Sequence, residues 1–174
     1  MALLLDHGIL DETGRLVEPE EAENPQLARR LMSTPRGEPG FHLTDDGSVY
    51  VSQRDIRELQ LAKAAVRTGM DSLLREEGLH AGDLDGIRLA GNFGGALDVR
   101  AAIRIGLIPA VDPEKVDVVG NAALRGAALA LVSRERRDRA VQDARATTFL
   151  ELAGKPEFQA HFADSMMFTE TQAP

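Results

Sequence analysis

Two glycine-containing junctions are the part of this sequence whose residue types could bind a ligand. Each one directly follows a short apolar stretch, at residues 87–90 and 116–119. Glycines at the carboxyl end of a strand let the backbone approach a ligand, and open α/β sheets bind their ligands at that edge. The same glycines would also serve a tight turn that only lets the next helix pack, so the pattern alone leaves both interpretations open. The candidate residues are Ala90, Gly91, Asn92, Phe93 and Gly94 in the first junction and Gly120 and Asn121 in the second.

Familiar catalytic and phosphate-binding motifs do not fit this chain. The spacing of Gly91, Gly94 and Gly95 is not that of the dinucleotide fingerprint, and no P-loop motif occurs. The chain has no cysteine, and its four histidines are scattered, so we expect no metal site, no cysteine-ligated cluster and no thiolate nucleophile. Paired acid and base residues or a Ser–His arrangement are also missing from the pattern. A free-standing enzyme is therefore disfavoured, and we predict no catalytic residue.

A long helix carries the second group of candidates. Ser52 and Asp55 form a capping-box pattern that opens this helix, whose apolar residues recur at intervals of three and four. A helical wheel centres its apolar face near Val66, with Lys63 within about 60° of that centre and Arg67 at the edge. A lysine at this position can lay its stem along the core. It can also border a cleft and contact an anionic or polar ligand.

Strands that alternate with helices would position these candidates. Residues 1–40 are predicted to be a lead-in helical turn and a mobile acidic loop, and 41–170 the folded lobe. The alternation predicts an α/β fold with parallel pairing. Small residues in the first half of 122–145 would let that helix approach a sheet closely. The predicted elements are helices over 1–7, 24–32, 52–77, 98–105, 122–145 and from Pro156, a hairpin of 41–43 with 49–51, and strands over 87–90, 116–119 and 147–152.

Composition limits the classes of partner. The net charge of −8 argues against a nucleic-acid groove, because such a surface would be basic. No stretch approaches the roughly 20 apolar residues of a membrane span, and the first residues carry no basic leader. We therefore expect a cytoplasmic protein that binds neither membrane nor nucleic acid.

Several sequence blocks together resemble one family. The blocks are QRDIRELQLAKAAVRTG at 53–69, LAGNFG at 89–94, AIRIGLIP at 102–109, VGNAA at 119–123, FLEL at 149–152, PEFQ at 156–159 and Phe162. On these blocks the chain is similar, over about residues 1–170, to the carboxyl-terminal domain of ATP-dependent reductive activators of corrinoid proteins. These are modular iron–sulfur proteins with an ATPase domain of the actin, Hsp70 and sugar-kinase type. The resemblance implies a partial actin-like, ribonuclease H-like ATPase lobe with a short mixed sheet and flanking helices.

The resemblance also implies a ligand and a role. The glycine motif from Ala90 to Gly94 matches the strand-end motif that holds adenosine in this superfold, and Lys63 and Arg67 fall where the Hsp70 branch places polar residues beside ribose and adenine. The phosphate motifs and the iron–sulfur domain of the family do not precede the motif here, so the chain looks like an excised half of an ATPase domain. The implied cofactor is ATP, bound on its adenosine side only, with the iron–sulfur cluster elsewhere in the parent and no covalently bound group. We expect this chain alone to be inactive, and the parent to return cob(II)alamin to cob(I)alamin.

A different class of function stays open. The old nucleotide fold could be a non-catalytic interaction module that docks a corrinoid protein or mediates dimerisation. Apolar surface exposed on the lobe would allow homo-oligomers to form. Nucleotide binding separates the two hypotheses, and the sequence does not indicate which corrinoid protein is involved.

Overall fold

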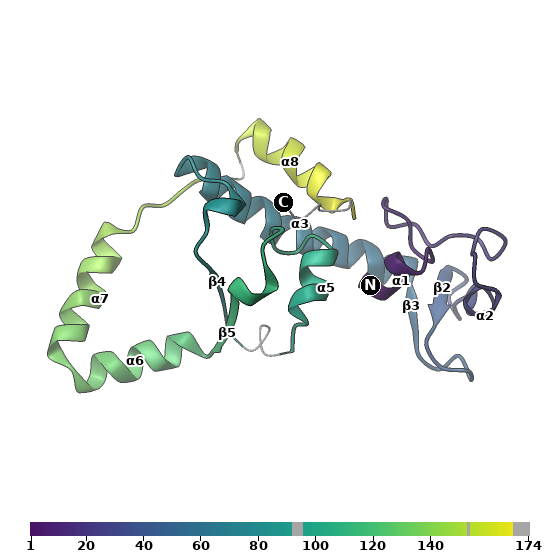
Figure 1. Cartoon of the computed structure of the whole chain (residues 1–174), viewed down its shortest axis with the longest axis horizontal. Coiled ribbons are helices and arrows are strands. Elements are labelled where there is room, and N and C mark those ends of the chain that lie inside the picture. Colours follow the sequence, from purple (N-terminus) through teal and green to yellow (C-terminus); the bar gives the residue numbers. More distant parts are fainter. Residues whose placement is uncertain (92–95, 153, 169–174) are drawn as a thin grey trace.

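The computed structural model describes residues 1–91, 96–152 and 154–168, arranged around one long helix (Figure 1). That helix, α3, runs across the body of the molecule, with a small sheet near each of its ends. The helices are α1 (Ala2–Asp6), α2 (Pro25–Ala28), α3 (Gln53–Glu76), α5 (Val99–Arg104), α6 (Ala122–Val132), α7 (Arg134–Ala146) and α8 (Pro156–Met166), with 3₁₀ turns η1 (Ala81–Asp83) and η2 (Pro113–Lys115). The strands are β1 (Leu31–Ser33), β2 (Pro39–His42), β3 (Tyr50–Ser52), β4 (Ile87–Ala90) and β5 (Val116–Gly120).

The strands form two separate sheets. Strands β1, β2 and β3 pair antiparallel in that order, and β2 with β3 is the predicted hairpin. Strands β4 and β5 pair parallel, with Ile87 opposite Val116 and Ala90 opposite Gly120. The α/β fold with parallel pairing is therefore confirmed, and the two strand directions occur in two small sheets rather than in one mixed sheet.

Helix α3 begins and ends as the sequence predicts. The Ser52 hydroxyl accepts a hydrogen bond from the Asp55 amide at 3.1 Å, and the Asp55 carboxylate accepts one from the Ser52 amide at 2.9 Å. Gly78, just beyond the helix, has the left-handed φ of 67° that favours glycine. This reciprocal capping satisfies free amides of the first turn and fixes the start of the helix.

The buried face of α3 differs from the one that the helical wheel predicts. Val66 is 45% exposed, whereas Gln60 and Lys63 are buried. The wheel centre was wrong because it counts apolar residues only, and the face that packs is partly polar. Its polar side chains hydrogen-bond to backbone carbonyls that segments distant in the sequence bring to it. The buried residues of α3 are Ile56, Gln60, Lys63, Ala64 and Thr68.

Part of the segment 11–40, which the sequence predicts to be a mobile loop, is built into the core. Leu16 and Leu31 are buried there, and Leu16 pairs with Leu10 in an isolated bridge. The predicted helix over 24–32 is shorter, since α2 ends at Ala28 and the chain turns into β1. The core also joins distant segments: its buried members are Ile9, Leu10, Leu16, Leu31, Phe41, Ile56, Ala102, Ile105, Leu107, Ile108 and Phe168.

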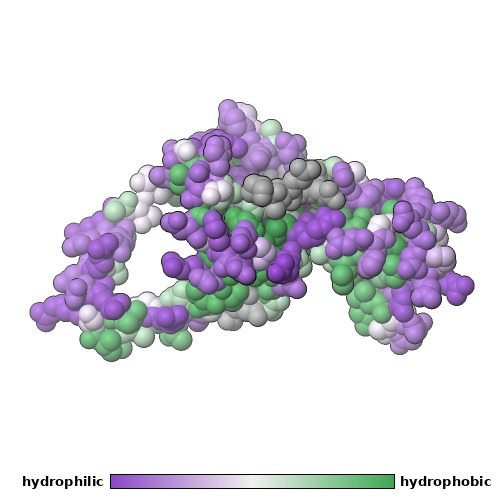
Figure 2. Space-filling view, in the orientation of Figure 1, coloured by the Kyte–Doolittle hydropathy of each residue, from purple (hydrophilic) through white to green (hydrophobic). Residues whose placement is uncertain are grey.

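The region after β5 departs most from the prediction. The helix expected over 122–145 breaks at Ser133, whose extended backbone (φ −132°, ψ 120°) lets its hydroxyl cap α7 by accepting from the Arg136 amide at 3.3 Å. Residues 147–152 form no strand; they are an extended connection to α8. We call α6, α7 and this connection the arm, which projects from the body and leaves an open space beside it (Figures 1 and 2).

The arm does not pack as its small residues suggest. Neither α6 nor α7 has a buried residue, so α6 does not lie against a sheet in the way the prediction assumed. Apolar side chains gather instead on the lower edge of the arm (Figure 2), where Leu131 and Val132 are 78% and 81% exposed. Within the three described ranges, no helix combines the length and the apolar character needed to cross a membrane.

Candidate functional site

The carboxyl ends of β4 and β5 meet at the two predicted glycine junctions. The Gly91 amide donates a hydrogen bond of 2.7 Å to the Gly120 carbonyl. Both glycines have left-handed backbones, with φ of 91° and 65°. A Cβ added at either would meet no described atom within 4 Å beyond the adjoining residues, so the left-handed backbone, and not crowding by the described residues, favours glycine there. The structure thus brings these two candidates together at an open edge of the parallel strand pair.

The other predicted residues at the two junctions differ in their positions and contacts. Ala90 lies opposite Gly120 after an irregularity in the strand register. The side-chain oxygen Oδ1 of Asn121 accepts a hydrogen bond from the Leu124 amide at 2.9 Å, and this bond caps α6. Asn92, Phe93 and Gly94 lie outside the described residues, so their role stays a prediction.

Lys63 is buried, 1% exposed, and holds the end of the described chain against α3. Its ammonium donates to the carbonyls of Ser165 at 2.6 Å and Met167 at 2.7 Å, and lies 5.0 Å from the centroid of the Phe168 ring. Burial, and secondarily the charge of Arg67, lower the pKa of Lys63 to about 8. Lys63 is buried, as its nearness to the predicted apolar face suggested, although that face is not centred on Val66, and its ammonium binds the protein's own backbone.

Arg67 belongs to a polar network between α3 and α8. Its Nε donates to Oδ2 of Asp71 at 2.8 Å, and Nε2 of His161 lies 3.0 Å from the same oxygen. The Arg67 side chain is 22% exposed. One oxygen of the Asp71 carboxylate therefore contacts both Arg67, one turn earlier on α3, and His161 on α8. This shared contact fixes the orientation of the Arg67 guanidinium group.

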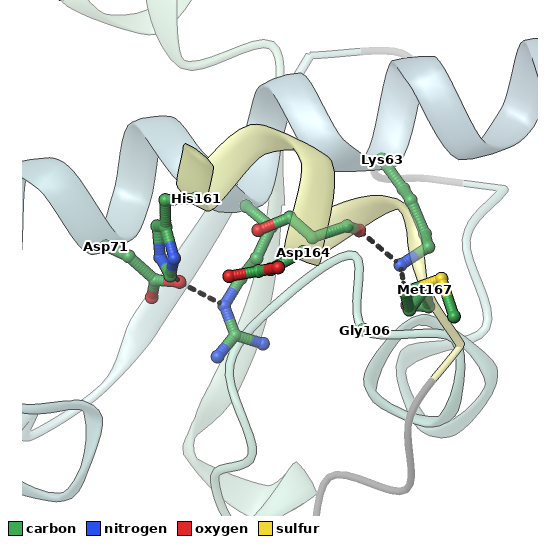
Figure 3. Close-up of a pocket in the computed structure, with 8 residues that line it drawn as sticks. Lys63, Asp71, Gly106, His161, Asp164 and Met167 are labelled. Atoms are coloured by element: carbon green, nitrogen blue, oxygen red, sulfur yellow. Dashed lines mark hydrogen bonds and ion pairs between the residues drawn. The ribbon is translucent and has the colours of Figure 1, made fainter. Parts of the chain in front are cut away.

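Lys63 and Arg67 line one cavity of about 180 Å³ between α3, α8 and the turn at Gly106 (Figure 3). Figure 3 shows His161 beside Asp71 at one end and Lys63 reaching toward Met167 at the other. Asp164 adds a second carboxylate to the lining. Of the described strand-end candidates, none lines this cavity, so the sequence-predicted residues form two clusters: Gly91 with Gly120, and Lys63 with Arg67.

Sequence reasoning missed the contribution of α8. His161, Asp164 and the carbonyls of Ser165 and Met167 complete the second cluster, yet they lie about a hundred residues from their partners on α3. The available signal was the polar side of the predicted amphipathic helix, on which His161 and Asp164 are three residues apart. Throughout the described part of the chain, no three His, Asp or Glu residues are grouped so as to hold a metal ion.

The parallel strand pair with glycine ends and the long helix beside it define the class of domain. The family model described as the C-terminal domain of RACo, the ASKHA domain, matches residues 1–174. This chain therefore belongs to the family of RACo carboxyl-terminal domains, and its fold is of the actin-like ASKHA class.

Two relatives carry more specific names. The corrinoid activation enzyme RamQ of Eubacterium limosum is 31% identical over 174 residues, which cover 97% of this chain and 29% of RamQ. A solved structure of a reductive activator for corrinoid, iron–sulfur protein matches with a TM-score of 0.80 and 30% identity, over 98% of this chain and 27% of that one. The sequence resemblance is thus confirmed, and the chain spans less than a third of the length of each relative.

Proposed function

We propose that this domain forms the adenosine side of the nucleotide site in an ATP-dependent reductive activator of corrinoid proteins. Membership of the ASKHA family supports nucleotide binding, and the names of the two relatives support the corrinoid role. The observation that carries the proposal is the pairing of Gly91 with Gly120 at the carboxyl ends of two parallel strands. That is the edge at which open α/β sheets bind ligands.

The strand-end residues fit the nucleoside half of ATP. Among the described residues beyond the adjoining ones, no atom lies within 4 Å of a Cβ added to either left-handed glycine, so these residues leave room for a flat base or a ribose to approach the backbone. We assign the adenosine contacts to residues 90–94 and 120–121. Arg67 is the helix residue that we retain as a polar contact, and Lys63 acts indirectly, because its ammonium already binds two carbonyls.

The phosphates and their magnesium ion require other groups. Charge-assisted hydrogen bonds supply most of the affinity for a triphosphate, and the strand-end glycines offer none. We therefore propose that this domain alone does not hydrolyse ATP. In the activator, ATP supplies the free energy for a conformational change that accompanies electron transfer from an iron–sulfur cluster to cob(II)alamin.

Replacing Gly91 tests the proposal. Gly91→Val in the protein at its natural length forces a β-branched residue into a left-handed backbone at the junction, and we expect ATP affinity by calorimetry to fall at least about tenfold. Gly37→Val is the matched control, because Gly37 also has a left-handed φ, of 80°, and open surroundings. Both variants should lose similar stability. Unchanged ATP affinity in Gly91→Val would defeat the proposal.

A second function, docking without a nucleotide, is favoured by one observation. The arm exposes apolar residues such as Leu131 and Val132, whose exposed fractions are 78% and 81%. If the protein binds a corrinoid protein but not ATP, and Leu131→Ser weakens that complex, the interaction module is the better account. ATP binding that depends on Gly91 supports the first function instead.

A further inference from the structure

We propose that a groove between α3, the turn at residues 78–81 and α8 binds a small oxyanion, a phosphate or a carboxylate group. The groove has a volume of about 460 Å³. Its polar lining comprises Arg67, Asp71, Arg75, His80 and His161. It contains none of the strand-end glycines and shares only Arg67 with the nucleotide contacts proposed above, so the anion site goes beyond that function.

The charges around this groove favour an anion. Asp71 is its only carboxylate among the described residues, and its Oδ2 already accepts from Arg67 and lies 3.0 Å from Nε2 of His161. The groove therefore has two positive charges, those of Arg67 and Arg75, and one negative charge, that of Asp71, so its lining has a net positive charge. In a chain with a net charge of −8, such a local excess of positive charge stands out.

The smaller cavity of about 180 Å³ on the other side of Arg67 is a poorer anion site. It shares Arg67, Asp71 and His161 with the groove, but Asp164 also lines it. The ammonium of Lys63, which could offset that second carboxylate, is engaged by two carbonyls. Like-charge repulsion by Asp164 therefore directs an anion to the outer groove.

Arg67 presents a guanidinium group that is already oriented. Its Nε is anchored on Asp71, and no described residue bonds its two terminal nitrogens. The side chain of Arg75, two helical turns further along the same face of α3, forms no hydrogen bond or ion pair with the described residues either. A planar guanidinium fork matches two oxygens of a carboxylate or phosphate, and its prior orientation lowers the entropy lost on binding.

Anion titrations monitored by NMR test the proposal on the whole chain. Inorganic phosphate and acetate are added at constant ionic strength, and the side-chain Nε–Hε signals of arginines are followed. We expect saturable shifts at Arg67 and Arg75, and at least fivefold weaker binding in Arg75→Gln. The control is Arg139→Gln, which removes an exposed arginine of the arm and should leave binding unchanged. Tighter phosphate than acetate binding would identify a phosphoryl ligand, and the reverse a carboxylate.

Two results would overturn the proposal. Linear shifts of equal size at every arginine would show ionic screening only. Unchanged affinity in Arg75→Gln would show that the charged side chains of Arg67, Asp71 and Arg75 have a structural role and do not bind an anion. The nucleotide proposal is tested separately, because Gly91→Val should weaken ATP binding and leave phosphate binding in this groove intact.

Discussion

The same local pattern, an arginine four residues before an aspartate on a helix, occurs in two regions of very different character. In α3, Arg67 and Asp71 have side chains 22% and 18% exposed and are joined at 2.8 Å. In α7 of the arm, Arg139 and Asp143 are 76% and 65% exposed and are joined at 3.1 Å. Among the described residues, the first pair alone has a third side-chain partner, His161, from another helix. The comparison shows that packing across segments, and not the local pattern, gives the first pair its rigidity.

The wider surroundings of the two pairs differ in the same way. Near Arg67, the Gln60 amide donates to the carbonyls of Thr13 at 2.9 Å and Met166 at 2.8 Å, so α3 is bonded to both a preceding and a following segment. The helices of the arm bury no residue. We infer that the α3–α8 region carries the stability of the described fold, and that the arm is its least stabilised part.

The largest expected effect comes from removing the buried lysine. Lys63→Ala leaves two carbonyls without their donor and opens a void, so the free energy of unfolding should fall by about 4 kcal/mol in urea titrations. Lys115→Ala is the matched control, since Lys115 also donates to a carbonyl, that of Leu84 at 3.1 Å, but at an exposed position. It should cost less than about 0.5 kcal/mol. Equal losses in the two variants would show that burial does not increase what the hydrogen bonds of Lys63 contribute to stability.

The second effect is a pH dependence of stability. Burial lowers the pKa of Lys63 from 10.5 to about 8, so between these values the unfolded chain binds a proton that the folded chain has released. The free energy of unfolding should therefore rise with pH from about 8 to 10.5, by at most about 3 kcal/mol from this group. Subtracting the profile of Lys63→Met from that of the wild type isolates the effect. A difference that is flat across this range would contradict it.

The smallest expected effect compares the two aspartates directly. Asp71→Ala removes the shared acceptor of Arg67 and His161 and should cost about 1–2 kcal/mol in free energy of unfolding. Asp143→Ala breaks an exposed pair of the same spacing and should cost less than about 0.5 kcal/mol. If thermal unfolding shows the two variants to be alike, the cross-helix network adds nothing to stability.

Local signals in the sequence predicted much of the fold. The capping box at Ser52 and the left-handed glycine at Gly78 act within a few residues, so the bounds of α3 could be predicted to within a residue or two. The break at Ser133 could not, because most residues around it favour helix and only the backbone conformation adopted there makes the hydroxyl a cap. The prediction of a strand over 147–152 failed for a related reason. A strand requires a pairing partner, and the sequence of the segment does not specify one.

The candidate site shows the same limit. Position after apolar stretches made the strand-end glycines candidates and the helical period did so for Lys63, and their part in ligand binding stays a prediction. The partners of Lys63 lie 102 and 104 residues away, so no spacing rule could show that its ammonium binds carbonyls of the chain itself. The contact of His161 with Asp71, 90 residues apart, is equally invisible before the helices are packed.

The most direct test of the central claim, that the strand ends bind a nucleotide, is to follow the backbone amide signals of Gly91 and Gly120 by NMR during addition of ATP. We predict saturable shifts at both glycines, with none at Gly37, which has a similar backbone in a distant turn. ATP binding that leaves the Gly91 and Gly120 signals unmoved, or no ATP binding by the protein at its natural length, would contradict the account.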